Sequence, residues 1–196
     1  MLLRALRPFA RHPSVRTIVV ALPVTTVAAP PAWLRDEFGE RLRLVAGGST
    51  RLDSVRNAVQ AIPPEHPVIL VHDAARPFVS FDTIARVIEQ VAAARNAVAA
   101  VPVTDTLKRA NSTMAVSETV DRTDLWRAQT PQGFVRAELE AAYDWFDREP
   151  HRPHVTDEAT LVELAGFSVT LVPDTTTNIK VTTPDDFDLA DALGRP

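Results

Sequence analysis

The chain has 196 residues, of which 45% are hydrophobic and 23% are charged, as in ordinary globular domains. Its formal net charge of -4 argues against a nucleic acid held by a basic surface. The sequence has no cysteine, which excludes disulfides, thiolate metal sites and a cysteine nucleophile, and its 5 histidines show no zinc-type spacing. No apolar run approaches the roughly 20 residues of a membrane span. We therefore expect one cytoplasmic domain over residues 1–196, without a membrane or nucleic-acid partner.

The first half of the chain alternates predicted helices with predicted strands. Apolar residues at helical spacing predict helices over residues 2–10, 32–38, 53–62 and 81–94. Runs rich in apolar or β-branched residues predict strands over residues 15–22, 41–46, 68–71 and 97–103, with a proline-rich turn after the first strand. This alternation is typical of parallel βαβ units that carry helices on both faces of the sheet.

The pattern changes after Val103. Two short segments, residues 105–109 and 117–122, indicate a β-hairpin with a loose tip. Because the hairpin has few apolar residues of its own, we expect it to lean on the main domain or on another subunit. Beyond it, the sequence predicts helices over residues 136–148, 157–164 and 184–193, and strands over residues 168–172 and 178–182.

The strand over residues 68–71 leads directly into the residues HDAARP. Ligands of open α/β sheets bind just beyond the carboxyl ends of the strands. Asp73 and Arg76 would lie at that position, with only two alanines between them. The alternative is structural, with Asp73 capping a turn and pairing with Arg76.

A second turn, GGSTRLDS, lies between a predicted strand and a predicted helix. Gly48 would let the backbone approach a ligand closely, and Arg51 and Ser54 would add hydrogen-bond donors. The same residues also fit a tight turn with a helix N-cap at Asp53 or Ser54.

Other polar residues allow two interpretations each. Lys108 and Arg122, at the hairpin ends, could face an anion or solvent. Residues 127–134 are uncharged after their arginine, which predicts a buried polar lining. Thr156 fits a helix N-cap, a place that also suits a phosphate, and Lys180 either points outward or holds phosphate charge. Together these groups predict an anionic, nucleotide-like ligand and leave the reaction open.

Six motifs, taken in order, resemble one family. They are GGSTRLDSV, VHDAARP, PVTDTLK, TVDRTDLWRAQTPQGF, VTDEATLVE and NIKVTTPDD. In this order and spacing they are similar to the 2-C-methyl-D-erythritol 4-phosphate cytidylyltransferase family over nearly the whole chain. The resemblance implies an α/β fold with a Rossmann-like, mostly parallel nucleotidyltransferase sheet and a protruding β-hairpin arm over residues 103–122.

The resemblance also implies an activity in non-mevalonate isoprenoid biosynthesis. CTP and 2-C-methyl-D-erythritol 4-phosphate would give 4-diphosphocytidyl-2-C-methyl-D-erythritol and pyrophosphate. The substrate phosphate attacks the α-phosphorus of CTP itself, so catalysis would consist of positioning and charge stabilisation without a protein nucleophile. Mg²⁺ would be bound mainly through the CTP phosphates, and the arm would form a homodimer.

The motifs also imply residue roles. Gly48, Arg51 and Ser54 would bind the nucleotide at its cytosine and ribose end, and Asp73 would belong to the nucleotide-binding set as well. Asp73 would hold the substrate hydroxyls or the metal-bound region, and Lys180 would neutralise the α-phosphate, so both would be catalytic. The implied substrate-binding set, part of it supplied by a partner's arm, is Arg76, Thr106, Arg122, Thr130, Thr156 and Lys180.

One feature departs from the family pattern. The family begins with a strand and a glycine-rich loop that carries an arginine and a lysine, whereas this sequence opens in the helix that follows such a loop. We therefore expect an enzyme whose sequence begins too late, and a sheet with unpaired edges where one strand is missing. Two alternatives stay open. One is a non-catalytic, nucleotide-binding or dimer-forming relic, and the other is a cytidylyltransferase for another alditol phosphate, such as ribitol 5-phosphate.

Overall fold

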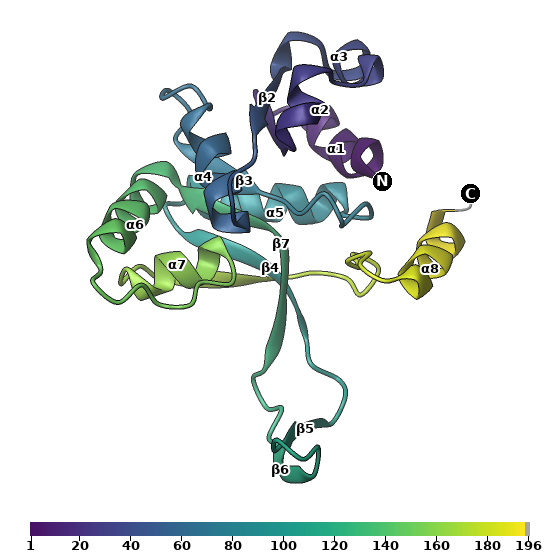
Figure 1. The fold of residues 1–196 in the computed structure, drawn as a ribbon, viewed down its shortest axis with the longest axis vertical. Coiled ribbons are helices and arrows are strands. Elements are labelled where there is room, and N and C mark those ends of the chain that lie inside the picture. The colour runs from purple at the N-terminus through teal and green to yellow at the C-terminus, as the bar shows by residue number, and fades with distance from the viewer. Residues whose placement is uncertain (195–196) are drawn as a thin grey trace.

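The computed structural model describes residues 1–194, and a four-stranded sheet forms its centre. The strands are β3 (Val68–Val71), β7 (Trp126–Val135), β4 (Asn96–Pro102) and β8 (Val169–Pro173), in that order across the sheet. β4 and β8 pair in parallel, whereas β7 runs antiparallel to both β3 and β4. Three of the four strands therefore share one direction, and the predicted α/β fold is confirmed (Figure 1).

Helices cover both faces of this sheet (Figure 1). α5 (Phe81–Ala92) packs on one face, and α6 (Arg136–Arg148) and α7 (Glu158–Leu164) pack on the other. Successive residues of β3 serve the two faces in turn, because side chains alternate along a strand. Ile69 belongs to the core cluster of α6 and α7, and Leu70 packs against that of α5. The short buried run that predicted β3 thus reflects a strand covered on both sides.

A separate two-stranded sheet lies beside the central one. β1 (Ile18–Leu22) pairs in parallel with β2 (Leu42–Ala46), and α1 (Leu2–Arg11) and α3 (Ala32–Phe38) pack on this pair. Within residues 1–194, β1 pairs only with β2, and β3 pairs only with β7. One edge of β1 and one edge of β3 are therefore unpaired, as expected from the sequence, and residues of both strands line a common apolar cavity.

Two predictions of local structure are wrong. The proline-rich turn after β1 contains a short helix, α2 (Val24–Ala28). Residues 178–182 join no sheet. The backbone N–H of Val181 instead donates to the carbonyl of Ala75 at 2.8 Å, because this segment docks on the turn after β3 rather than on a strand edge.

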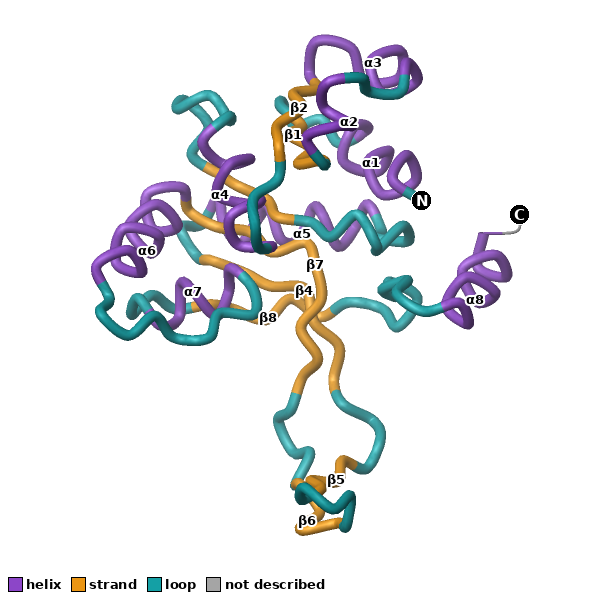
Figure 2. Tube along the Cα trace, in the orientation of Figure 1, coloured by secondary structure: helices purple, strands orange, loops and turns teal. Residues whose placement is uncertain are grey.

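α8 (Pro184–Gly194) begins at the predicted proline and has no buried residue. Figure 2 shows it apart from the helices that cover the sheet. None of the helices within residues 1–194 is both long enough and apolar enough to cross a membrane.

The segment predicted as a hairpin contains an antiparallel pair, β5 (Leu107–Ala110) and β6 (Val116–Val120). Figures 1 and 2 show this pair at the far end of the extended chain that continues from β4 and leads back into β7. Every residue of the pair except Val120 is exposed. We refer to residues 103–122 as the arm.

Candidate active site

Four charged side chains meet at the carboxyl end of β3, and we call them the charge cluster. Asp73 accepts from Lys180 Nζ at 3.0 Å through Oδ2, and from Arg51 Nε and Nη2 at 3.3 Å through Oδ1. Arg51 Nη1 donates to Glu158 Oε2 at 2.6 Å. The turn after β3, the start of α4, the start of α7 and the segment before α8 therefore converge on one point, and two of these groups are predicted catalytic residues.

The start of α4 (Arg51–Gln60) fixes where Arg51 points. Thr50 is the N-cap of this helix, and it forms a capping box in which its side chain accepts from the backbone N–H of Asp53. The predicted N-cap at Asp53 or Ser54 is therefore wrong by three or four residues, because both residues already belong to the first helical turn. Arg51 consequently begins the helix and reaches across the cavity edge to Asp73.

Burial differs sharply within the charge cluster. The side chain of Glu158 is fully buried and that of Asp73 is 15% exposed, whereas Arg51 is 35% and Lys180 is 45% exposed. Glu158 Oε1 lies buried without a hydrogen-bond partner among the described residues. The carboxylates thus form the floor of the cluster, and the cations form its solvent-facing side.

The pKa values of the two carboxyl groups shift in opposite directions. Burial raises the pKa of Asp73, but Lys180 and Arg51 together outweigh burial and leave this pKa below its usual value. Burial also raises the pKa of Glu158, and its single cation, Arg51, does not reverse the shift. Burial lowers the pKa of Arg51, but Glu158 and Asp73 outweigh that effect and raise it. Asp73 is therefore an anion poised between two cations.

Arg76 lies on the same turn, with its guanidinium held mainly by another segment. Arg76 Nη1 donates to the carbonyl of Asn178 at 2.8 Å, while Arg76 Nε lies 3.9 Å from Asp73 Oδ2. The backbone N–H of Arg76 donates to the carbonyl of Asp73 at 2.9 Å. Asp73 and Arg76 are thus joined through their backbones in a turn, as the structural alternative suggested. The principal side-chain partners of Asp73, however, are Lys180 and Arg51 rather than Arg76.

Gly48 and Ser54 meet in the turn before α4. The backbone N–H of Gly48 donates to Ser54 Oγ at 3.0 Å, and Ser54 Oγ donates to the carbonyl of Thr50 at 2.9 Å. A Cβ atom on Gly48 would lie 2.2 Å from Asp53 Cβ, so only glycine fits there. In the structure the tight fit at Gly48 is made to the chain's own helix, and the predicted approach to a ligand stays a prediction.

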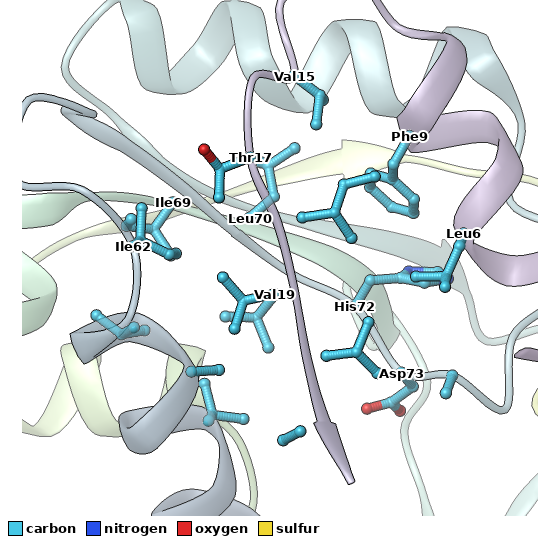
Figure 3. A pocket seen from close by; sticks show the side chains of 18 of the residues that line it. Leu6, Phe9, Val15, Thr17, Val19, Ile62, Ile69, Leu70, His72 and Asp73 are labelled. Atoms are coloured by element: carbon cyan, nitrogen blue, oxygen red, sulfur yellow. The ribbon is translucent and has the colours of Figure 1, made fainter. Parts of the chain in front are cut away.

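An apolar cavity of about 680 Å³ opens beside the charge cluster. Figure 3 shows Asp73 and His72 at one part of its wall, with Val19 and Ile69 among its apolar lining residues. Arg51, Ser54 and Lys180 also line it. The cavity therefore combines one polar, charged wall with walls contributed by β1, β3 and α1.

The remaining predicted site residues lie in three places. Thr130 is 3% exposed, and its hydroxyl bonds to the backbone N–H of Asp73 and to His72, which places it beneath the turn. Thr156 is exposed and is not the N-cap that the sequence suggested, because Asp157, the next residue, caps α7 with its side chain. Thr106 and Arg122 are exposed on the arm. Within one chain, Thr130 thus contacts the turn that carries Asp73, whereas Thr106 and Arg122 lie on a projecting segment away from it.

Sequence reasoning missed two of the groups that organise the site, although Glu158 and His72 lie within the motifs VTDEATLVE and VHDAARP. Glu158 follows the helix N-cap, a position where acidic residues normally face solvent, and its partner Arg51 lies 107 residues away. His72 is one of five scattered histidines. Of the segment predicted as a buried polar lining, residues 129–134 are buried, including Gln129, Thr130 and Gln132, whereas residues 127 and 128 are exposed.

Comparisons with known proteins agree with this architecture. Residues 1–195 match the family model described as IspD, 2-C-methyl-D-erythritol 4-phosphate cytidylyltransferase. A bifunctional enzyme IspD/IspF of Anaeromyxobacter dehalogenans is 46% identical, and the match covers 98% of this chain and 50% of that protein. The 2-C-methyl-D-erythritol 4-phosphate cytidylyltransferase of Syntrophus aciditrophicus is 36% identical, with 98% and 82% covered.

A solved structure leads to the same family. The crystal structure of 2-C-methyl-D-erythritol 4-phosphate cytidylyltransferase from Thermus thermophilus superposes with a TM-score of 0.83 at 36% identity, covering 99% of this chain and 86% of that one. The chain thus spans about half the length of the bifunctional relatives and most of the length of the others. With the family model matched from residue 1 to residue 195, the chain belongs to the 2-C-methyl-D-erythritol 4-phosphate cytidylyltransferase family.

Proposed function

We propose that this chain transfers CMP from CTP to 2-C-methyl-D-erythritol 4-phosphate in isoprenoid biosynthesis. A phosphate oxygen of the acceptor forms a bond to the α-phosphorus of CTP, and the bond from that phosphorus to the α–β bridging oxygen breaks. The products are 4-diphosphocytidyl-2-C-methyl-D-erythritol and pyrophosphate, with no covalent enzyme intermediate. Both substrates are water-soluble phosphates, and we place the reaction in the cytoplasm.

The charge cluster is the observation that carries this proposal. Phosphoryl and nucleotidyl transfer need little protein chemistry beyond positioning and neutralisation of developing charge. The Lys180 side chain is 45% exposed, and its Nζ lies 3.0 Å from Asp73 Oδ2, so the ammonium group is anchored by Asp73 and would still be accessible to an α-phosphate. Arg51, the first residue of α4, presents a second cation at the same edge and would face a nucleotide bound there.

Asp73 is the carboxylate that fits a magnesium ion shared with the substrate. Within residues 1–194, no group of three or more His, Cys, Asp or Glu side chains could hold a metal by itself. Mg²⁺ typically binds through one or two carboxylates together with substrate phosphates, and Asp73 suits that mode because its lowered pKa keeps it anionic. When bound, the ion neutralises phosphate charge.

The arm supports a homodimer in the same proposal. Leu107, Met114 and Val116 are 37%, 83% and 61% exposed, so the arm carries apolar side chains that its own chain leaves uncovered. Exposed apolar groups gathered on a projecting segment mark an interaction surface. A second copy would cover them and could bring Thr106 and Arg122 to the acceptor phosphate of its neighbour.

A coupled pyrophosphate assay tests the function. We expect pyrophosphate release that requires both CTP and 2-C-methyl-D-erythritol 4-phosphate, and that is slower with ribitol 5-phosphate assayed in parallel. Lys180→Gln should lower kcat while leaving the fold intact by circular dichroism. Absence of turnover in the folded, dimeric wild-type protein would refute the proposal, and faster turnover of ribitol 5-phosphate would reassign the acceptor.

A further inference from the structure

A closed hydrogen-bond circuit joins His72 and Thr130 to the turn that carries Asp73 and Arg76. The backbone N–H of Asp73 lies 3.0 Å from Thr130 Oγ1, which lies 2.9 Å from His72 Nδ1. On the other side of the ring, His72 Nε2 lies 3.0 Å from the carbonyl oxygen of Arg76. The circuit closes through the hydrogen bond that the backbone N–H of Arg76 donates to the carbonyl of Asp73, at 2.9 Å.

The two ends of this circuit determine where each proton lies. The carbonyl of Arg76 can only accept, so His72 Nε2 carries a proton. The backbone N–H of Asp73 can only donate, so the oxygen of Thr130 accepts from it. In a neutral ring His72 Nδ1 is then an acceptor, and the hydroxyl proton of Thr130 points to it. Each donor has one acceptor, which makes the circuit directional.

The circuit is fixed from outside as well. The ring of Phe9 in α1 lies 4.8 Å from the ring of His72, centroid to centroid, and Thr130 is 3% exposed in β7. Figure 3 shows His72 beside Phe9 and next to Asp73 in the cavity wall. A side chain held by two hydrogen bonds and one aromatic contact has little conformational freedom, and the backbone to which it is hydrogen-bonded is restricted as well.

We propose that His72 is a positioning residue, which acts through Thr130 to hold the Asp73–Arg76 turn in its reactive orientation. The turn carries two charged groups, the Asp73 carboxylate, which pairs with Lys180, and the Arg76 guanidinium, which donates to the carbonyl of Asn178. A small displacement of the turn would therefore change both of these contacts. Both ring nitrogens of His72 are engaged within the circuit, so in this proposal His72 acts on the substrates only through the turn. This inference rests on the proposed function, because it assigns the oriented groups to nucleotidyl transfer.

The tautomer of His72 tests the circuit without any turnover. Nitrogen-15 NMR of the folded protein near neutral pH should show His72 with a protonated Nε2 and an unprotonated Nδ1. The backbone amide of Asp73 should exchange slowly with solvent in the wild type and in Thr130→Ser, and faster in Thr130→Val. A protonated Nδ1, or equal exchange in the three proteins, would overturn the inference even if the enzyme were fully active.

Kinetics test the positioning role. Thr130→Val and His72→Phe should each lower kcat about 10-fold, since a misplaced reacting group costs rate rather than binding. The KM for CTP should change by less than about twofold, and the double variant should be no slower than either single variant, because both remove one circuit. Thr130→Ser restores a hydroxyl and should recover most of kcat.

A second threonine–histidine pair in the same cavity wall supplies the control. Thr17 Oγ1 lies 3.1 Å from His66 Nε2, and this pair does not contact the turn. Thr17→Val should keep the wild-type kcat, with melting shifted no further than in Thr130→Val. Equal loss of kcat in Thr17→Val, or additive losses in the double variant, would show a general packing effect and refute the positioning role. An inactive wild type with the expected tautomer would instead refute the proposed function alone.

Discussion

The turn that carries Asp73 and the arm that carries Arg122 differ in where their hydrogen bonds end. The turn is bound by β7, by α4 and by the segment around Lys180, and the Asp73 side chain is 15% exposed. The arm bonds mainly to itself, as in the pair between Arg109 and Glu118 at 2.5 Å, where both side chains are more than half exposed. The chain thus fixes the turn by itself, whereas the strands of the arm stay almost entirely exposed.

Lys180→Gln, which removes the cation paired with Asp73 of the turn, should have the largest effect on activity. We expect kcat to fall about 10²–10³-fold, because a preorganised charge that meets the developing transition-state charge is lost. The melting temperature should change little, since the side chain is 45% exposed. Stopped pyrophosphate assays with Lys180→Arg as the charge-conserving control measure this. A variant with the wild-type kcat would remove Lys180 from the reaction.

Arg51→Met tests how strongly the fold depends on the ion pair between Arg51 and the buried Glu158. Removing the cation leaves Glu158 fully buried and unpaired, which should lower the free energy of unfolding by about 3 kcal/mol. Arg56→Met is the matched control on the same helix, because the pair of Arg56 with Asp147 is at the surface and should contribute about 0–1 kcal/mol. Urea unfolding compares the two variants, and equal losses would contradict the distinction.

The pH dependence of stability gives a third test of the turn. Burial of His72 lowers its pKa to about 4, against an ordinary value of 6.5. The unfolded chain therefore binds a proton below pH 6.5 that the folded chain accepts only near pH 4. Stability is full above the unfolded pKa and should fall between those values, by up to about 1.4 kcal/mol per pH unit.

Urea unfolding across this pH range checks that slope. His72→Phe should flatten the dependence, while His154→Gln, at an exposed position, should leave it as in the wild type. The opposite ranking of the two variants would show that another group controls acid stability.

A substitution in the arm should change association between copies of the chain rather than the stability of a single copy. Val116→Asp places a charge on a side chain that is 61% exposed, so the free energy of unfolding of the monomer should change by less than about 0.5 kcal/mol. The dissociation constant of the proposed dimer should rise about 10-fold, because the charge would be desolvated between copies. Analytical ultracentrifugation measures this, with Glu118→Gln as the control. Unchanged association together with lost stability would mean that the arm packs on its own chain.

Sequence patterns predicted local structure well wherever the order of apolar residues within one helix or strand reflects how that element is buried. α3, β3 and α6 have the predicted bounds because apolar spacing and flanking prolines act within a few residues. The prediction of a strand for the segment around Lys180 was wrong. Its alternating residues suggested a strand, but a strand also requires a partner edge, and the segment met the turn at Ala75 instead.

The sequence by itself determined that Asp73 follows a buried strand and, through six ordered motifs, which family the chain belongs to. Tertiary structure alone decided that Asp73 lies between Lys180 and Arg51, that Glu158 is buried beneath Arg51, and that His72 grips the turn. The physical reason is distance along the chain. Strand and helix patterns arise between neighbours, whereas the ion pair of Arg51 with Glu158 joins residues 107 positions apart, which only the tertiary fold brings together.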